Sequence, residues 1–185
     1  MILEKYISEK NCLDLVSIKK GLPGIHADSC GHYYTACMAT LHRSGHKDGV
    51  LMQLDGDRKG GVKLHWNDYF DDCIDRTWQE INYCTDHAAV CVSCMLAIKE
   101  TNYTIIERSC KGDGFDYWLG HKEDSLFEHV ARLEISGILK ENTNNTVEKR
   151  LKMKEKQTEQ SDNSCLPAYI SIIEFGTPKA LFKRK

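Results

Sequence analysis

The sequence lacks any uninterrupted apolar run of the roughly 18 residues that a membrane-spanning helix needs. Charged residues also interrupt the first stretch, MILEKYISEKNCLDL, every two or three positions, unlike the apolar segment of a secretory signal. The formal net charge is only −2, so no global field of one sign points to a nucleic-acid or membrane partner, although a local patch is compatible with it. We therefore expect a cytoplasmic protein that does not enter a membrane.

The chain also lacks an internal repeat and a linker rich in proline, glycine or serine. Its 185 residues, 41% of them hydrophobic, suffice to bury one core. The sequence thus predicts a single domain, 1–185. Within it we expect an N-terminal extension (1–70) that contains a β-hairpin, a core (71–178) and a frayed basic tail, KALFKRK (179–185).

Cysteine is plentiful, but the nine residues are odd in number and irregularly spaced, which favours reduced thiols over a disulfide framework. The one CxxC pair, Cys91 and Cys94, falls in a predicted helix, and we expect both residues to be buried and free of metal. The histidine- and cysteine-rich stretch 26–46 fits no common zinc module, so we expect polar strand and loop there. Zinc is not expected, although a zinc-dependent binding module stays open as an alternative, with these potential ligands: Cys30, Cys37, His42 and His46.

Hydrophobic periodicity predicts helices alternating with strands. Two short apolar runs, 50–54 and 62–66, flank the turn-rich DGDRKGG and indicate a hairpin. Residues 71–100 contain neither glycine nor proline and predict one long helix, with a possible break near Asn82. Strands are expected in NYTIIERS, ARLEISGIL and PAYISIIEF, with a polar helix between the last two. This order predicts an α/β (α+β) fold in which helices flank a mixed central β-sheet.

Three acidic residues occupy informative places in this order. Asp116 follows a predicted strand and lies among aromatic residues and three glycines, in GDGFDYWLG. Glu134 lies in the middle of the next strand. Asp86 lies on the small-residue face of the long helix, where we expect it to be buried or nearly so. We expect Asp116 and Glu134 on adjacent strands, and three converging carboxylates would repel one another. A hard divalent cation such as Mg²⁺ or Mn²⁺ relieves that repulsion.

A helix with an acid, a strand, an Asp, a strand with a Glu, then a helix and a strand resembles the core of the PD-(D/E)XK nuclease superfamily. Many restriction and defence nucleases belong to it. The resemblance spans roughly residues 71–175, a little over half of the chain, and its motif is short. It implies a restriction-endonuclease-like core in which Asp116 and Glu134 are the catalytic acids and metal ligands. Asp86 would take the place of the acid that many members carry on the first helix.

The sequence departs from this family at the third motif position, where Ser136 replaces the expected lysine. Some members supply that lysine from the following helix. If Val147 and Leu151 form the buried stripe of this helix, Lys154 comes next on the same face, whereas Lys152 and Lys156 point away. We therefore expect Lys154 to be the substitute.

The resemblance implies a Mg²⁺- or Mn²⁺-dependent nuclease that hydrolyses phosphodiester bonds of DNA or RNA, as in bacterial or phage defence. The backbone carbonyl of Ile135 would complete the metal ligands, and Ser136 or Gln157 would assist Lys154. The basic run KRLKMKEK would contact phosphates, but no aromatic-plus-basic pattern of single-strand binding is visible along the chain. A second protein subunit and a homodimer are further expected partners.

Other interpretations of the same residues stay open. Asp116 would be an ordinary turn residue, Glu134 would pair with Arg132 or a helix lysine, and Asp86 would bond a neighbouring hydroxyl group. The protein would then be a non-catalytic subunit of a defence or toxin–antitoxin assembly that uses the apolar strand AYISIIEF as a pairing edge.

Overall fold

An eight-stranded mixed β-sheet organises the computed structural model, which describes residues 11–67, 69–123 and 126–185. Its strand order is β1-β3-β2-β8-β7-β6-β5-β4. Most neighbouring strands are antiparallel, but β1 and β3, β2 and β8, and β6 and β7 are parallel. The strands are β1 (Cys12–Asp14), β2 (Leu51–Gly56), β3 (Gly60–His65), β4 (Tyr103–Arg108), β5 (Tyr117–His121), β6 (Ala131–Ile138), β7 (Ala168–Glu174) and β8 (Lys179–Arg184).

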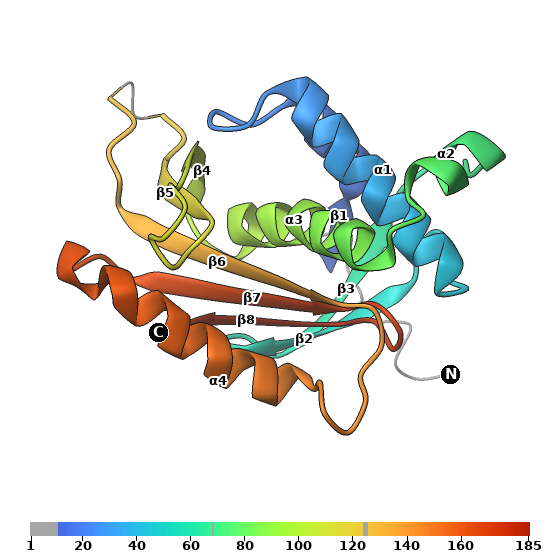
Figure 1. The fold of residues 1–185 in the computed structure, drawn as a ribbon. Coiled ribbons are helices and arrows are strands. Elements are labelled where there is room, and N and C mark those ends of the chain that lie inside the picture. Colours follow the sequence, from blue (N-terminus) through green and yellow to red (C-terminus); the bar gives the residue numbers. More distant parts are fainter. Residues whose placement is uncertain (1–10, 68, 124–125) are drawn as a thin grey trace.

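Helices cover both faces of this sheet (Figure 1). Helices α1 (Ala27–Arg43) and α3 (Ile81–Glu100) cross one face, and α4 (Val147–Thr158) lies along the opposite face. The short helix α2 (Asp72–Thr77) and two 3₁₀ helices, Leu15–Lys20 and Glu159–Ser164, complete the described elements. The predicted α/β class, a mixed sheet flanked by helices, is therefore confirmed.

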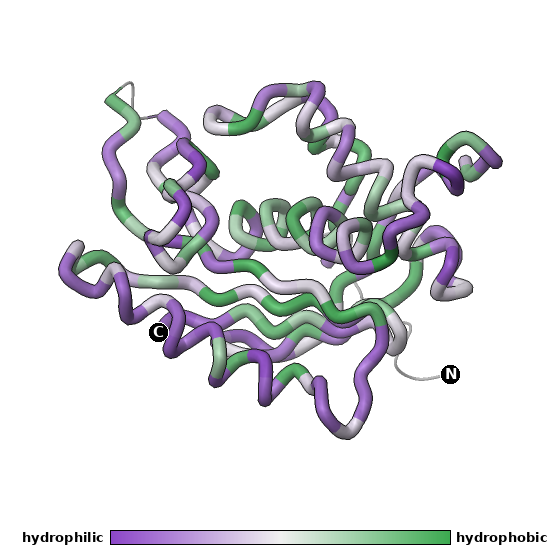
Figure 2. Tube along the Cα trace, viewed as in Figure 1, coloured by the Kyte–Doolittle hydropathy of each residue, from purple (hydrophilic) through white to green (hydrophobic). Residues whose placement is uncertain are grey.

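Helix α3 is the central helix of the larger core. It packs against α1 on one side and against strands β4, β6 and β7 on the other, and Figure 2 shows it as mainly hydrophobic. Gly137 permits its close approach to β6, because a side chain there would lie only 2.6 Å from the carbonyl oxygen of Thr85. In the described part of the chain, α3 alone is long and apolar enough to span a membrane, but these contacts identify it as a core helix.

The two faces of β6 point to different environments. Leu133 and Ile135 belong to the core beneath α3, whereas Ile138 packs with Ile170 and Ile172 of β7 beneath α4. Because side chains alternate along a strand, Glu134 shares the α4 face with Ile138. This alternation brings an acid from the sheet under a helix that is mainly hydrophilic (Figure 2).

Helix α4 is held by a narrow apolar stripe and a side-chain cap. The hydroxyl oxygen of Thr146 accepts a hydrogen bond from the backbone N–H of Lys149 at the N-terminus of the helix. Val147 is buried, and Leu151 packs on the same small core, which places the next residue of that stripe, Lys154, over the sheet.

Several sequence-based expectations are confirmed. The hairpin is formed by β2 and β3, and the predicted long helix is divided into α2 and α3 between residues 77 and 81, close to the expected break at Asn82. Cys91 and Cys94 are buried in α3.

Other expectations are wrong. Residues 27–43 form helix α1 instead of polar strand and loop, because Cys30, Tyr33, Cys37 and Leu41 recur at helical spacing and are buried. The expected frayed tail is strand β8, whose Ala180 and Phe182 are buried alternately with partly exposed residues. Strand β7 lies between β6 and β8, so its backbone is not available as a pairing edge.

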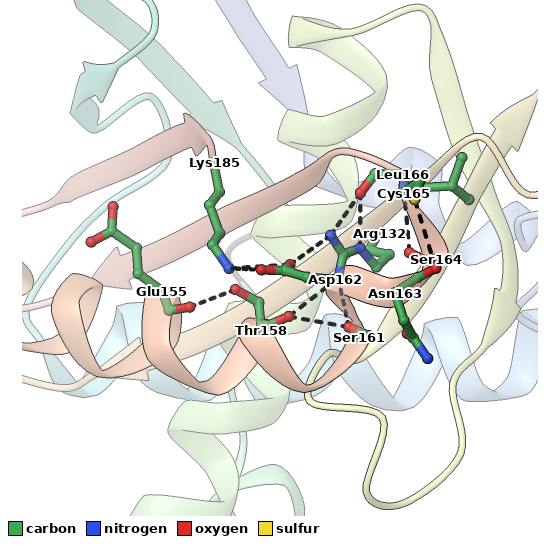
Figure 3. Close-up of polar contacts among 10 residues, drawn as sticks. All are labelled: Arg132, Glu155, Thr158, Ser161, Asp162, Asn163, Ser164, Cys165, Leu166 and Lys185. Atoms are coloured by element: carbon green, nitrogen blue, oxygen red, sulfur yellow. Dashed lines mark hydrogen bonds and ion pairs between the residues drawn. The ribbon is translucent and has the colours of Figure 1, made fainter.

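Arg132 joins the start of β6 to the segment that follows α4 (Figure 3). Its side chain is 3% exposed. It donates hydrogen bonds to the carbonyl oxygens of Leu166 and Thr158, to the hydroxyl of Ser161 and to the carboxylate of Asp162. Arg132 is therefore fully engaged away from Glu134, so the expected Arg132–Glu134 pair is not formed.

We expect Arg132→Ala to lower the free energy of unfolding by about 3 to 5 kcal/mol, since it leaves several buried acceptors without a donor. Urea denaturation followed by circular dichroism measures this loss. Arg76→Ala, at an exposed arginine on α2, is the matched control and should change stability by about 0.5 kcal/mol or less. Equal effects of the two substitutions would contradict a structural function of the Arg132 contacts.

Candidate functional site

Asp116 lies where strands β5 and β6 separate. The two strands pair only from Tyr117 and Leu133 to Leu119 and Ala131. Just outside this ladder, the backbone N–H of Asp116 donates to Leu133 O at 2.9 Å. The Asp116 Oδ2 atom accepts from Ile135 N–H at 2.8 Å. The carboxylate thus takes the place of a strand partner, which fixes it at the fork.

The glycine-rich loop before β5 packs on the C-terminal part of α4. Gly114 has a φ of +81°, and a side chain there would lie 2.4 Å from the carbonyl oxygen of Gln157. Only glycine fits such a close approach with this backbone conformation. The aromatic neighbours Phe115 and Tyr117 are buried, so the loop directs Asp116 inward between them.

Glu134 faces α4 from the middle of β6 and is 1% exposed. Its Oε1 atom accepts a hydrogen bond from Lys154 Nζ at 2.5 Å and one from Gln157 Nε2 at 3.0 Å. Lys154 also donates to Gln157 Oε1 at 3.0 Å, which closes a triangle of side chains. The other oxygen, Glu134 Oε2, is buried and has no hydrogen-bond partner among the described residues.

Asp116 and Glu134 are close enough for each carboxyl group to influence the pKa of the other. Burial, followed by the charge of Asp116, raises the pKa of Glu134 to about 7, against the attraction of Lys154. Burial also raises the pKa of Asp116, although the Ile135 N–H and Lys154 oppose this rise. Lys154 and Arg108 partly offset the negative charge of these two buried acids, and a bound proton or cation would offset it further.

A cavity of about 270 Å³ opens beside this pair, between α3 and α4. Asp86 lies on its wall but is exposed to solvent, so the expectation that this acid is buried is wrong. Ser136 also lines the cavity and accepts a hydrogen bond from Arg150 Nη1 at 3.2 Å. Basic and aromatic side chains from other elements complete the wall: Tyr33, His87, Arg108, Arg150 and Lys154.

The residues at the fork fit a divalent cation by their chemistry. Asp116 and the unpaired Glu134 Oε2 offer carboxylate oxygens, the donors that Mg²⁺ and Mn²⁺ prefer, and Ile135 lines the same cavity. Three or more His, Cys, Asp or Glu side chains are nowhere arranged to hold a metal ion within residues 11–67, 69–123 and 126–185. Asp86 is therefore not a third carboxylate of a formed cluster, and backbone oxygens and water would have to supply the remaining ligands.

The potential zinc ligands of the stretch 26–46 do not converge. Cys30 and Cys37 are buried in the core beneath α1. His42 stacks on Phe70, with ring centres 4.0 Å apart, and His46 bonds the carbonyl oxygen of Phe175 at 2.6 Å. These positions rule out a shared zinc site made by these residues as they are placed.

Comparison with known proteins identifies no relative: no family model, no curated protein and no solved structure matches this chain.

The sequence predicts that Asp116, Glu134, Lys154 and Gln157 come together, but it does not predict four basic or aromatic residues of the cavity wall. Tyr33 was missed because α1 was not recognised, although its spacing from Cys30 and Cys37 is helical. The other three, His87, Arg108 and Arg150, are placed by tertiary packing and carry no local pattern.

We expect Glu134→Gln to flatten the pH dependence of folding stability in EDTA. The folded-state pKa of Glu134, about 7, exceeds its ordinary value of 4.5. The proton that Glu134 binds in the folded protein therefore stabilises the fold fully below about pH 4.5, and this contribution is lost as the pH rises through 7. The wild-type protein should lose about 2 to 3 kcal/mol from this group between pH 5 and pH 8.

Urea denaturation at several pH values measures this slope. Glu148→Gln, which removes an exposed carboxylate of α4, is the control and should keep the wild-type slope. If Glu134→Gln also keeps the wild-type slope, Glu134 does not titrate as its surroundings require.

Proposed function

We propose that this protein is a metal-dependent nuclease that hydrolyses phosphodiester bonds in DNA or RNA. The observation that carries the proposal is the buried pair Asp116 and Glu134 at the fork of β5 and β6, with Lys154 on Glu134 and one carboxylate oxygen unpaired. Crowding two acids in this way costs stability in the absence of a cation, which is typical of a site built for one.

The order of elements around the pair supports the same proposal. Helix α3, strands β4, β5 and β6, helix α4 and strand β7 follow one another along the chain. Asp116 immediately precedes the second of these three strands, and Glu134 lies in the third. This arrangement agrees with the PD-(D/E)XK core that the sequence resembles, with Lys154 of α4 in place of the missing motif lysine.

Asp116, Glu134 and the backbone carbonyl of Ile135 would hold one or two Mg²⁺ or Mn²⁺ ions. Such an ion, when bound, lowers the pKa of a water molecule and neutralises charge on the phosphate. Lys154 would orient the attacking water and stabilise the developing negative charge, and Gln157 fixes the position of its ammonium group. Arg108 and Arg150, on the wall of the same cavity, would bind the neighbouring phosphate oxygens.

We further propose that the protein is cytoplasmic, as its free cysteines suggest. We also propose that it acts in a bacterial or phage defence system, with a second protein subunit or as a homodimer.

Asp116→Asn and Glu134→Gln should each reduce Mn²⁺-dependent cleavage of DNA or RNA by at least about 100-fold, because each removes an anionic ligand while preserving side-chain shape. Isothermal titration with Mn²⁺ should show weakened binding for both variants. Full cleavage by either variant would contradict the proposed site.

Lys154→Ala should lower the cleavage rate by about 100-fold or more without weakening Mn²⁺ binding, because it removes an electrostatic stabiliser that competes with the ion for Glu134. Lys156→Ala, at an exposed lysine on the same helix, is the matched control and should cleave at the wild-type rate. Loss of Mn²⁺ affinity in Lys154→Ala would instead make this lysine a support for the carboxylates.

One observation favours a second candidate function. Lys154 already neutralises Glu134 within the described part of the chain, so the pair needs only a proton to be stable. A nuclease fold of this kind without turnover would serve as a non-catalytic nucleic-acid-binding subunit. Absence of cleavage by the wild-type protein with Mg²⁺ or Mn²⁺ on single- and double-stranded DNA and RNA would favour that function.

A further inference from the structure

A cluster of aromatic and imidazole rings covers the open side of α1 and α3. The exposed rings of His32 and Tyr83 pack on the buried ring of Trp78, with ring centres 4.4 Å and 5.9 Å away. His87 completes the cluster, with its ring centre 4.0 Å from that of Tyr83. Exposed rings held by buried rings are ordered before any ligand binds, so stacking on them would cost little conformational entropy.

This cluster is continuous with the cavity at the carboxylate pair. His87 belongs to both, and its ring lies 5.5 Å from that of Tyr33, which also lines the cavity. Tyr83 and Val90, a further residue of the cavity wall, are separated by seven residues of α3, or about 10 Å along the helix. That distance corresponds to about three nucleotides of a stacked strand at about 3.4 Å each.

The charge next to the rings suits an anion. Arg108 lies at the same wall, where its Nη1 atom donates to Tyr33 Oη at 3.2 Å, and Arg150 and Lys154 face the cavity from α4. Burial, followed by the nearby His87, lowers the pKa of His32, so its exposed imidazole is neutral at pH 7 and stacks as an uncharged ring.

The exposed rings suit a flat apolar group, and the basic cavity beside them suits an anion. A nucleotide carries both kinds of group. Its phosphate would meet the arginines while its base would stack on the rings. An unpaired base exposes a face for stacking on a protein ring, whereas bases in the interior of a duplex stack on one another. The sequence shows no such pattern because the rings and basic side chains come from α1, the connection between α2 and α3, α3, β4 and α4.

We propose that this site acts on single-stranded or locally unpaired nucleic acid, an inference that rests on the proposed nuclease function. Tyr83 is the exposed ring on which an unpaired base near the scissile phosphate stacks. Tyr83 is 50% exposed and donates only its backbone N–H to the Glu80 side chain that caps α3, so its ring is available to a ligand.

Binding is tested without turnover in an Asp116→Asn background with EDTA, by fluorescence anisotropy of labelled single-stranded DNA, single-stranded RNA and a blunt duplex of the same sequence. Tyr83→Ala should weaken single-strand binding by about 5- to 100-fold, the effect of losing one stacked base. Tyr83→Phe keeps the ring and should bind within twofold of the parent. Tyr69→Ala, at a tyrosine 64% exposed outside the cluster, should also bind like the parent.

Tighter binding of DNA or of RNA identifies the strand type, and either supports the proposal if Tyr83→Ala weakens it. Parent-like binding by Tyr83→Ala, an equal loss in Tyr83→Phe, or a preference for the duplex would overturn it. Tyr83-dependent binding without cleavage by the wild-type protein in Mn²⁺ would retain the stacking of an unpaired base on Tyr83 and overturn the nuclease function. Failure to bind any of the three nucleic acids would overturn both.

Discussion

The structure depends on a buried pair of acids at the point where two strands separate. Asp116 replaces the missing strand partner of Ile135, and the preceding residue, Glu134, projects toward α4. Lys154 and Gln157 then connect Glu134 to that helix. The fork, the loop before β5 and the C-terminal half of α4 are therefore held together by a single polar network.

This network fixes the two carboxylates in place but leaves one buried oxygen without a hydrogen bond in the described part of the chain. Hydrogen bonds to one oxygen of each carboxylate fix the two groups, yet Glu134 Oε2 is left unsatisfied in a low-dielectric setting. A fold that needed these acids only for stability would gain by replacing them with apolar residues. The retention of a charged, under-bonded pair next to a cavity with Arg108 and Arg150 supports the proposed phosphate-processing metal site.

The sequence alone predicts features that depend on contacts between residues near in the chain, and it misses features that depend on contacts between distant residues. Helical and strand periodicity placed Glu134 and Lys154 on the faces where they meet, because both positions follow from local repeat geometry. The expectation that Asp86 is buried is wrong because the stripe of small residues on α3 ends in a cavity that is open to solvent. No local sequence pattern indicates such a cavity. Strand β8 was missed because its lysines hide a period-two pattern that is completed only by pairing with β2 and β7.

Metal binding at the fork can be tested with a crystal of the protein soaked in Mn²⁺ and anomalous diffraction collected near the manganese edge. We expect an anomalous peak at the fork, about 2.1 to 2.3 Å from an oxygen of Asp116 and from an oxygen of Glu134. Lys154 should then be displaced from the oxygen that it bonds in the metal-free protein. An unchanged Lys154–Glu134 pair with no peak at the fork, in a crystal that takes up Mn²⁺ elsewhere, would contradict a metal site made by these two acids.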